Sequence, residues 1–126
     1  MTAGKIILVV DDEPVIARSL SAILSSHGYE VKYALSAEEG LLATEVWTPD
    51  LAIIDVILPK KNGIEMAIAL RVKHPEMRLL LFSGQAETNE LLEEANKRGH
   101  RFEVLAKPAH PVVVLETISK LLAKAG

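Results

Sequence analysis

The stretch Ile6-Ile7-Leu8-Val9-Val10-Asp11-Asp12 places five consecutive apolar residues directly before two carboxylates. Two further apolar runs also end in charged residues: residues 51–54 are followed by Asp55, and residues 104–106 by Lys107. In an open parallel sheet the carboxyl ends of neighbouring strands meet at one crevice, so residues just past separate strands come together there. The sequence therefore predicts a pocket that holds three carboxylates and one ammonium.

Short apolar runs alternate with amphipathic stretches along the whole chain, which is typical of repeated βα units. The first run is apolar at nearly every position, as expected for a strand that helices cover on both faces. The predicted strands are residues 5–10, 29–34, 51–54, 78–83 and 102–106. The predicted helices are about residues 14–27, 37–47, 63–73, 86–98 and 111–123. Five strands and five helices therefore account for the chain.

Several helix ends carry the expected local signals. Pro14 suits a first helical turn, where its missing N–H has no partner to lose. Ser36 and Glu39 have the spacing of a capping box, and Gly28 and Gly99 are C-terminal stops. In the last helix, the predicted buried stripe consists of Val112, Leu115, Ile118, Leu121 and Leu122.

Length and composition limit the class of protein. With 126 residues and 49% hydrophobic content, the chain is expected to form one domain, residues 1–126, with a core on either side of a sheet. Its net charge of −3 gives no basic field for nucleic acid. No apolar run approaches the roughly 20 residues of a membrane span. The absence of cysteine excludes thiol catalysis and thiolate metal sites, and it fits a cytoplasmic protein.

Three carboxylates in a partly desolvated pocket repel one another, so they need a cation or raised pKa values. A hard divalent ion meets that need, and oxygen-only ligands in an open site suit Mg²⁺. Ser83 ends the fourth predicted strand with a hydroxyl that could donate to a phosphoryl oxygen. Each signal alone has an ordinary explanation: residues 11–13 can cap a helix, Asp55 can open a loop, and Lys107 can be a solvated strand end. Their order at the ends of strands one, three, four and five favours one shared site.

Together these residues resemble the receiver domains of two-component response regulators, over the chain from Lys5 to about Lys124. The motifs that carry the resemblance are Asp11-Asp12, Asp55 with the loop that follows it through Pro59 and Asn62-Gly63, Ser83, and Lys107-Pro108. The resemblance implies an α/β fold: a flavodoxin-like, doubly wound sheet of five parallel strands in the order 2-1-3-4-5, with five helices. It also implies a single receiver domain of the chemotaxis-regulator type.

The same resemblance implies a role for each site residue. Asp55 would be the phosphoacceptor, and Ser83 and Lys107 would contact the phosphoryl group. Asp11 would also orient a metal-bound water. The ligands of Mg²⁺ would be Asp11, Asp12, Asp55 and the backbone carbonyl of Ile57.

Partners are implied in the same way. The chain would take its phosphoryl group from a histidine kinase or a histidine phosphotransfer protein, and would then switch the surface that binds an unknown downstream protein. It would be a signalling phosphoacceptor that assists its own phosphorylation and dephosphorylation, rather than an enzyme. It would be cytoplasmic, a monomer or weak homodimer, and would bind neither nucleic acid nor a membrane.

Val104 departs from the pattern of the family. Receivers that signal through a rotating aromatic side chain usually carry Tyr, Phe or His three residues before the lysine, where this chain has Val104. Phe102 lies on the same face of the predicted strand by alternation, and would substitute only in part. The response is therefore expected to run through the loop after Ser83 and the following helix. Pro108 is expected to have a cis peptide bond that fixes the direction of Lys107.

Other classes fit the residues less well. A flavodoxin-like cofactor binder needs N–H donors after the first strand, where this chain has three acids and Pro14. A phosphatase with an aspartyl nucleophile needs a second acid two residues after the first, and Glu13 matches that imperfectly. No Gly-rich loop for ATP occurs. The alternative that stays open is a receiver-like interaction module that is not phosphorylated, which a Mg²⁺-dependent response to beryllofluoride would distinguish.

Overall fold

The computed structural model describes residues 5–84, 88–107 and 109–123, with residue 88 described by its backbone alone. Its five strands form one parallel sheet in the order β2-β1-β3-β4-β5. The strands are β1 (Ile6–Val10), β2 (Glu30–Ala34), β3 (Leu51–Asp55), β4 (Arg78–Ser83) and β5 (Glu103–Ala106). The predicted α/β class and strand order are confirmed. The expected cis bond at Pro108 and helix start near residue 86 lie outside the described residues.

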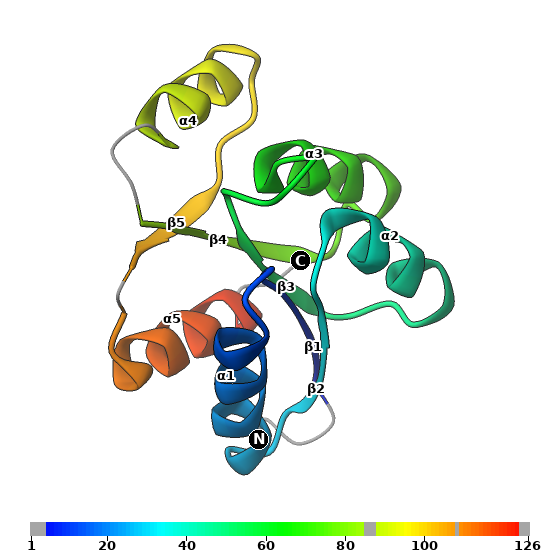
Figure 1. Cartoon of the computed structure of the whole chain (residues 1–126), viewed down its shortest axis with the longest axis vertical. Coiled ribbons are helices and arrows are strands. Elements are labelled where there is room, and N and C mark those ends of the chain that lie inside the picture. The colour runs from blue at the N-terminus through cyan, green and yellow to red at the C-terminus, as the bar shows by residue number, and fades with distance from the viewer. Residues whose placement is uncertain (1–4, 85–87, 108, 124–126) are drawn as a thin grey trace.

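Helices cover both faces of this sheet. They are α1 (Pro14–Ser26), α2 (Ala37–Val46), α3 (Gly63–Lys73), α4 (Thr88–Lys97) and α5 (Pro111–Ala123). Helices α1 and α5 lie side by side on one face, while α2 and α3 cover the other and α4 stands further out beside β5 (Figure 1). Within the described residues, no helix is long and apolar enough to cross a bilayer.

The apolar runs of the central strands are explained by two separate cores. Successive side chains of a strand point to opposite faces, so Leu8 and Ile54 pack under α2 and α3, while Ile7 and Ile53 pack under α1 and α5. All four side chains are at most 1% exposed. A strand buried on both faces has no position for a polar residue until it reaches the edge of the sheet. This is why the carboxylates appear only where β1 and β3 end.

The predicted start signals of α1 and α2 are present, and α3 has a side-chain cap that was not predicted from the sequence. The Ser36 Oγ accepts a hydrogen bond from the Glu39 N–H at 3.1 Å, and Pro14 is the first residue of α1. The Asn62 Oδ1 accepts from the Glu65 N–H at 2.9 Å, which fixes the start of α3 just past the loop that follows Asp55. These side chains satisfy N–H groups that have no partner inside the helix.

Two predictions about the last third of the chain are wrong in detail. Val112 is 54% exposed, and Val114 takes its place in the core of α5 at 3% exposure. The two residues are separated by about 200° around the helix, so only one can join the stripe that continues through Ile118. The fifth strand begins at Glu103 rather than Phe102, because Glu103 is the first residue that pairs with β4.

Candidate functional site

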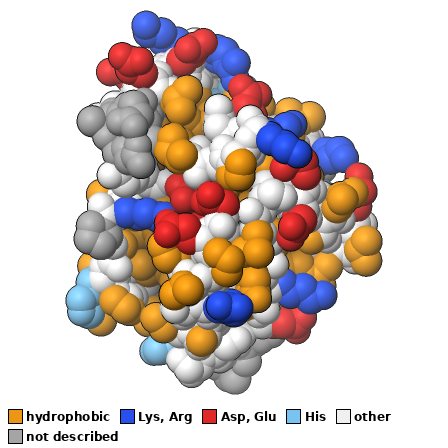
Figure 2. Space-filling view, viewed as in Figure 1, with side chains coloured by type: hydrophobic (Ala, Val, Ile, Leu, Met, Phe, Trp, Pro, Cys, Tyr) orange, Lys and Arg blue, Asp and Glu red, His pale blue; other side chains and the backbone are white. Residues whose placement is uncertain are grey.

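The predicted charged residues meet at one edge of the sheet. Asp11 follows β1, Asp55 is the last residue of β3, and Lys107 follows β5. Strands β1, β3, β4 and β5 are neighbours in that order, so their carboxyl ends lie along one edge. Acidic side chains gather near the middle of the molecular face that looks toward the viewer, with apolar side chains around them (Figure 2).

Lys107 joins two of these carboxylates. Its Nζ donates to the Oδ2 of Asp11 and to the Oδ2 of Asp55, each at 3.0 Å, across 96 and 52 residues of sequence. The Lys107 side chain is 22% exposed, whereas the side chains of Asp11 and Asp55 are 3% and 11% exposed. One ammonium therefore balances two largely buried carboxylates, and the site keeps an excess of negative charge.

Backbone groups hold the other oxygens of both carboxylates. The Oδ1 of Asp11 accepts from the Glu13 N–H at 3.0 Å, and the Oδ1 of Asp55 accepts from the Ile57 N–H at 3.2 Å. These are local turns in which an aspartate side chain bonds the backbone two residues on. With both oxygens engaged, each carboxylate is held in one orientation.

The pKa values reflect this crowding. Burial raises the pKa of Asp55 above its ordinary value and the charge of Asp11 adds to the effect, while the hydrogen bonds from Lys107 and the Ile57 N–H oppose it. For Lys107, burial alone would lower the pKa, but the hydrogen bonds to Asp11 and Asp55 and their charges outweigh burial, so the pKa is raised. The lysine therefore stays charged, and Asp55 is more basic than an exposed aspartate.

A third carboxylate completes an acidic cluster. Asp11, Asp12 and Asp55 each offer one oxygen, and these oxygens lie within 4.8 Å of one another. Asp12 is exposed and the other two are buried, so the cluster is open to solvent on one side. Oxygen donors beside an open side, with net negative charge, are the surroundings that a hard cation such as Mg²⁺ prefers, because it keeps several of its waters.

A pocket of about 600 Å³ opens over the cluster. Ile57 contributes to its wall with a side chain that is 40% exposed, so the residue whose carbonyl was expected to bind metal does border the site. The remaining lining residues are Asp12, Glu13, Ile16, Asp55, Gly84 and Lys107.

Ser83 ends β4 at the same edge and is partly buried. Its backbone oxygen accepts a hydrogen bond from the Lys107 N–H at 3.0 Å, and it pairs with Ala106 in the sheet. The structure thus brings Ser83 to the position along the edge where the sequence placed it, between the end of β3 and Lys107.

Gly63 supports the acceptor strand in a way that sequence reasoning missed. Its N–H donates to the Val56 oxygen at 2.9 Å, and a Cβ built on Gly63 would collide with the backbone oxygen of Asp55. The pair Asn62-Gly63 indicated only a break in the loop. The signal that could have found the contact is the position of a glycine at the start of a helix that packs directly under a buried strand end.

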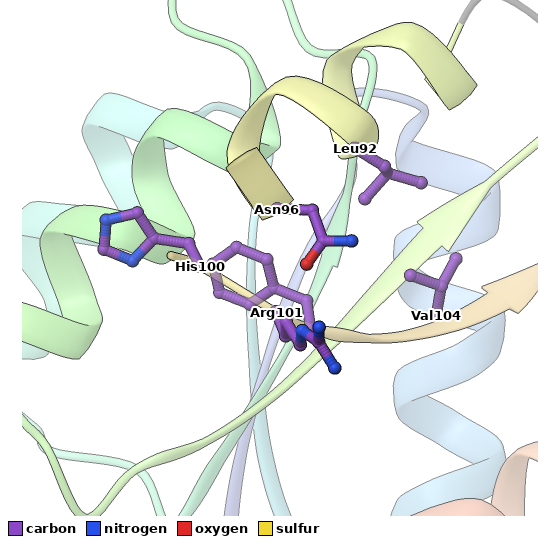
Figure 3. A pocket seen from close by; sticks show the side chains of 6 residues that line it. Leu92, Asn96, His100, Arg101 and Val104 are labelled. Carbon is purple, nitrogen blue, oxygen red and sulfur yellow. The ribbon is translucent and has the colours of Figure 1, made fainter. Parts of the chain in front are cut away.

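The sequence departs from the family pattern at Val104, and this residue lines a cavity in the structure. A second cavity, of about 310 Å³, lies between α4 and β5 (Figure 3). The Phe102 ring lies 4.2 Å from the Arg71 guanidinium and is stacked with His100 at 6.4 Å between ring centres. The residues that line this cavity are Leu92, Asn96, His100, Arg101, Phe102 and Val104.

Comparison with known proteins identifies the family. The model of the response regulator receiver domain matches residues 7–119. The chain is 30% identical to the chemotaxis protein CheY of Thermotoga maritima, over 94% of this chain and 98% of that protein. It is 36% identical to the transcriptional activator protein ExaE of Pseudomonas putida, over 93% of this chain and 55% of that protein. The chain thus spans about half the length of the first curated relatives that it matches.

Solved structures agree with the sequence comparison. A CheY-like response regulator receiver domain protein from Methanospirillum hungatei JF-1 superposes with a TM-score of 0.85 at 32% identity, covering 94% of this chain and 93% of the other. The family match extends from β1 into α5 and includes every strand end that contributes to the acidic pocket. The chain therefore belongs to the response regulator receiver domains of two-component signalling systems.

Proposed function

We propose that Asp55 accepts a phosphoryl group from a phosphohistidine on a kinase or phosphotransfer protein, and that the modified domain changes how it binds a downstream protein. The observation that carries this proposal is the pair of 3.0 Å hydrogen bonds from Lys107 to Asp11 and Asp55, beside a third carboxylate. Such a pocket offers a buried, oriented nucleophile together with positive charge for an incoming phosphoryl group. We further propose that residues 1–126 form one receiver domain that acts in the cytoplasm.

In the proposed reaction a carboxylate oxygen of Asp55 forms a bond to phosphorus while the bond between phosphorus and the donor imidazole nitrogen breaks. The imidazole leaves with the electron pair of that bond and takes up a proton from solvent. The raised pKa of Asp55 favours this attack, because a more basic carboxylate is a better nucleophile. The aspartyl phosphate that results is later hydrolysed at the same site.

Two other side chains assist the transfer. Lys107 moves its ammonium from the Asp55 carboxylate to the oxygens of the arriving phosphoryl group, and it stays protonated because its pKa is raised. The Ser83 hydroxyl donates to the same oxygens from the end of β4. Asp11, Asp12, Asp55 and the Ile57 carbonyl would hold Mg²⁺, which supplies positive charge to the phosphoryl oxygens when it is bound.

The test is labelling by acetyl phosphate with Mg²⁺, followed by intact mass and peptide mapping. The wild-type chain should gain one phosphoryl group, and Asp55→Asn should gain none. Asp50→Asn is the matched control, because Asp50 lies at the opposite end of β3 and bonds the Ile6 N–H through an oxygen that asparagine retains. Labelling of the Asp55 variant, or a modified peptide that contains Asp11 or Asp12, contradicts the assignment. A chain that is never labelled would instead be a receiver-like interaction module.

The metal is tested separately by calorimetry. Asp12→Ala should lose Mg²⁺ affinity, because one of three clustered oxygens is removed. Without metal the variant should be at least as stable as the wild type, since like charge in the cluster is relieved. Glu38→Ala removes an exposed acid from the first turn of α2 and should leave the affinity unchanged. Equal Mg²⁺ affinity of Asp12→Ala and wild type would contradict the ligand set.

A further inference from the structure

Gly84 and Lys107 leave the sheet side by side. Ser83 is paired with Ala106 in the last rung between β4 and β5, and the Lys107 N–H donates to the Ser83 oxygen at 3.0 Å. Gly84 is the next residue after Ser83, so it lies beside the first residue past β5. The start of the Lys107 side chain is therefore adjacent to the Cα of Gly84.

The stem of Lys107 occupies the place where a side chain at Gly84 would be. A Cβ built on Gly84 would lie 3.2 Å from the Cβ of Lys107, 3.5 Å from its Cδ and 3.8 Å from its Cγ. The first contact is shorter than ordinary van der Waals distance, and it involves a carbon that is fixed to the backbone. Three carbons of the lysine thus run along the open face of the glycine.

The need for glycine here comes from space and not from backbone conformation. Among the described glycines, those with positive φ are Gly28 and Gly99, at 95° and 90°. Gly84 therefore has a conformation that other residues also adopt. Gly99 is the opposite case, since a Cβ there would meet nothing within 4 Å.

The course of the stem decides where the ammonium lies. A lysine side chain has four rotatable bonds and many staggered conformations, of which few bring Nζ to 3.0 Å from both Asp11 and Asp55. The observed conformation passes across Gly84. A larger residue at this position would push the stem away and carry the ammonium off the carboxylates.

We propose that Gly84 is a positioning residue for phosphoryl transfer: its missing side chain leaves the path along which Lys107 reaches the acceptor. This inference rests on the proposed function of Asp55. The effect of a substitution should grow with its size. Alanine requires a shift of a few tenths of an ångström, whereas valine adds two methyl groups beyond the Cβ and blocks the path.

The experiment measures the rate of labelling by acetyl phosphate with Mg²⁺ in wild type, Gly84→Ala, Gly84→Val, Lys107→Ala and the double variant Gly84→Val/Lys107→Ala. Gly84→Val should be slower by about tenfold or more, because displacing a charged group by about 1 Å costs up to about 100-fold. Gly84→Ala should be slower by a smaller factor. In the Lys107→Ala background, Gly84→Val should change the rate by less than about twofold, since residues that act through one group are not additive.

If the valine slowed labelling for a purely structural reason, the factors lost in Gly84→Val and in Lys107→Ala would multiply in the double variant. That result overturns the inference. Wild-type speed of Gly84→Val, with Lys107→Ala slow and Asp55 labelled, overturns the inference and leaves the proposed function standing. Absence of labelling in the wild type overturns both. If circular dichroism shows that Gly84→Val does not fold, Gly84→Ala is compared in the wild-type and Lys107→Ala backgrounds instead. A slower rate only where Lys107 is present supports the inference, and equal slowing in both backgrounds overturns it. Gly99→Ala is the control: it is strained, but it should be labelled at the wild-type rate.

Discussion

Strands β3 and β5 belong to the same sheet but differ sharply in how deeply their residues are buried. All five residues of β3 are buried, and β3 pairs with a neighbour on each side. β5 is an edge strand in which no residue is fully buried, and Ala95 is the buried residue among the described side chains of α4 beside it. Figure 1 shows the same contrast, with β3 in the middle of the molecule and α4 standing out from it.

The contrast suggests that the reaction takes place at the well-packed centre of the sheet, whereas the structural response to it takes place at the loosely packed edge. A nucleophile needs a fixed position, and Asp55 obtains it at the end of the best packed strand. A surface that changes on phosphorylation needs two arrangements of similar free energy, which loosely packed elements provide more readily than a full core. We therefore expect substitutions near β3 to affect stability strongly and α4 with β5 to respond to the state of the site.

The largest effect is expected at Gly63. Gly63→Ala forces a Cβ against the backbone oxygen of Asp55, which a central strand cannot move away, so the free energy of unfolding should fall by about 3 kcal/mol or more. Gly99→Ala lies in open space before β5 and carries only the strain of its positive φ, about 1 to 2 kcal/mol. Urea denaturation measures both. A smaller loss at Gly63 than at Gly99 would contradict the contrast.

Amide hydrogen exchange compares the two strands directly. The N–H groups of β3 should be protected about 100-fold more than those of β5, because opening an edge strand exposes far less apolar surface than opening the centre. Exchange followed by NMR under native conditions gives the factor for each residue. Equal protection of the two strands would show that α4 and β5 are part of one cooperative unit with the core.

Lys107→Ala tests the charge balance that ties β5 to the centre. At pH 7 it should lower the free energy of unfolding by about 1 to 3 kcal/mol, since it leaves Asp11 and Asp55 buried without their cation. The loss should shrink near pH 4, because Asp55, whose pKa is raised, takes up a proton there. Lys73→Ala breaks an exposed pair with Glu45 at 3.5 Å and should change stability little.

The raised pKa values give the sign of the wild-type pH dependence. A raised pKa means that the folded chain holds the proton more tightly than the unfolded chain. The contribution of Lys107 is therefore complete below its ordinary pKa of 10.5 and is lost as pH rises through the raised value. The contribution of Asp55 is complete below about pH 4 and is lost as pH rises through its own raised pKa. The loss in Lys107→Ala depends in addition on the ionised Asp55 carboxylate, so equal losses at pH 4 and pH 7 would contradict a role for that carboxylate in holding the lysine.

A smaller effect concerns the lifetime of the phosphorylated form. Ile57 is 40% exposed at the wall of the pocket and offers no hydrogen bond to a water that must attack phosphorus. Ile57→Asn should shorten the lifetime about threefold by admitting and orienting water. Decay of the phosphorylated mass after removal of acetyl phosphate gives the rate. Val72→Asn, on an exposed valine of α3, serves as the control and should decay like the wild type.

The smallest free-energy change is expected for the conformational change that follows phosphorylation. NMR shifts on addition of beryllofluoride and Mg²⁺ show which residues take part in it. The largest shifts should fall at Ser83 and the first turn of α4, as the hydroxyl is drawn to the bound group. Phe102 should shift less, because its ring is in contact with Arg71 and stacked with His100. Shifts that centre on Phe102 to Val104, with Ser83 unmoved, would contradict this route of output.

The sequence predicted the fold and the meeting of Asp11, Asp55 and Lys107 for one physical reason. Apolar runs mark strands that are covered on both faces, and the topology of parallel strands then places the residues after them at one edge. Nothing beyond the strand ends is needed for that step. The positions of these side chains are therefore readable from the chain, even though residues as far as 96 apart are joined.

The contacts made by individual residues at the ends of helices and strands could not be predicted from the sequence. Gly63 and Gly84 matter because of what lies against them, Asp55 in one case and Lys107 in the other, and both neighbours come from distant parts of the chain. The apolar character of Val112 predicts a place in the core, but the rotation of α5 about its axis is set by how the whole helix packs. The apolar run predicts that Phe102 belongs to β5, but pairing with β4 begins only at Glu103, which depends on where β4 lies and not on the apolar character of residue 102.

The order of the strands has a consequence for synthesis on the ribosome. β2, β1 and β3 are neighbours in the sheet, and all three are complete once the chain has been made as far as Asp55. A nascent chain of that length already contains the three carboxylates but not Lys107, which follows β5. β4 then joins the sheet beside β3, and β5 joins beside β4. The emerging domain should thus pass through a stage in which the carboxylates of the site are present without the lysine, and the ammonium that bonds Asp11 and Asp55 arrives only with β5.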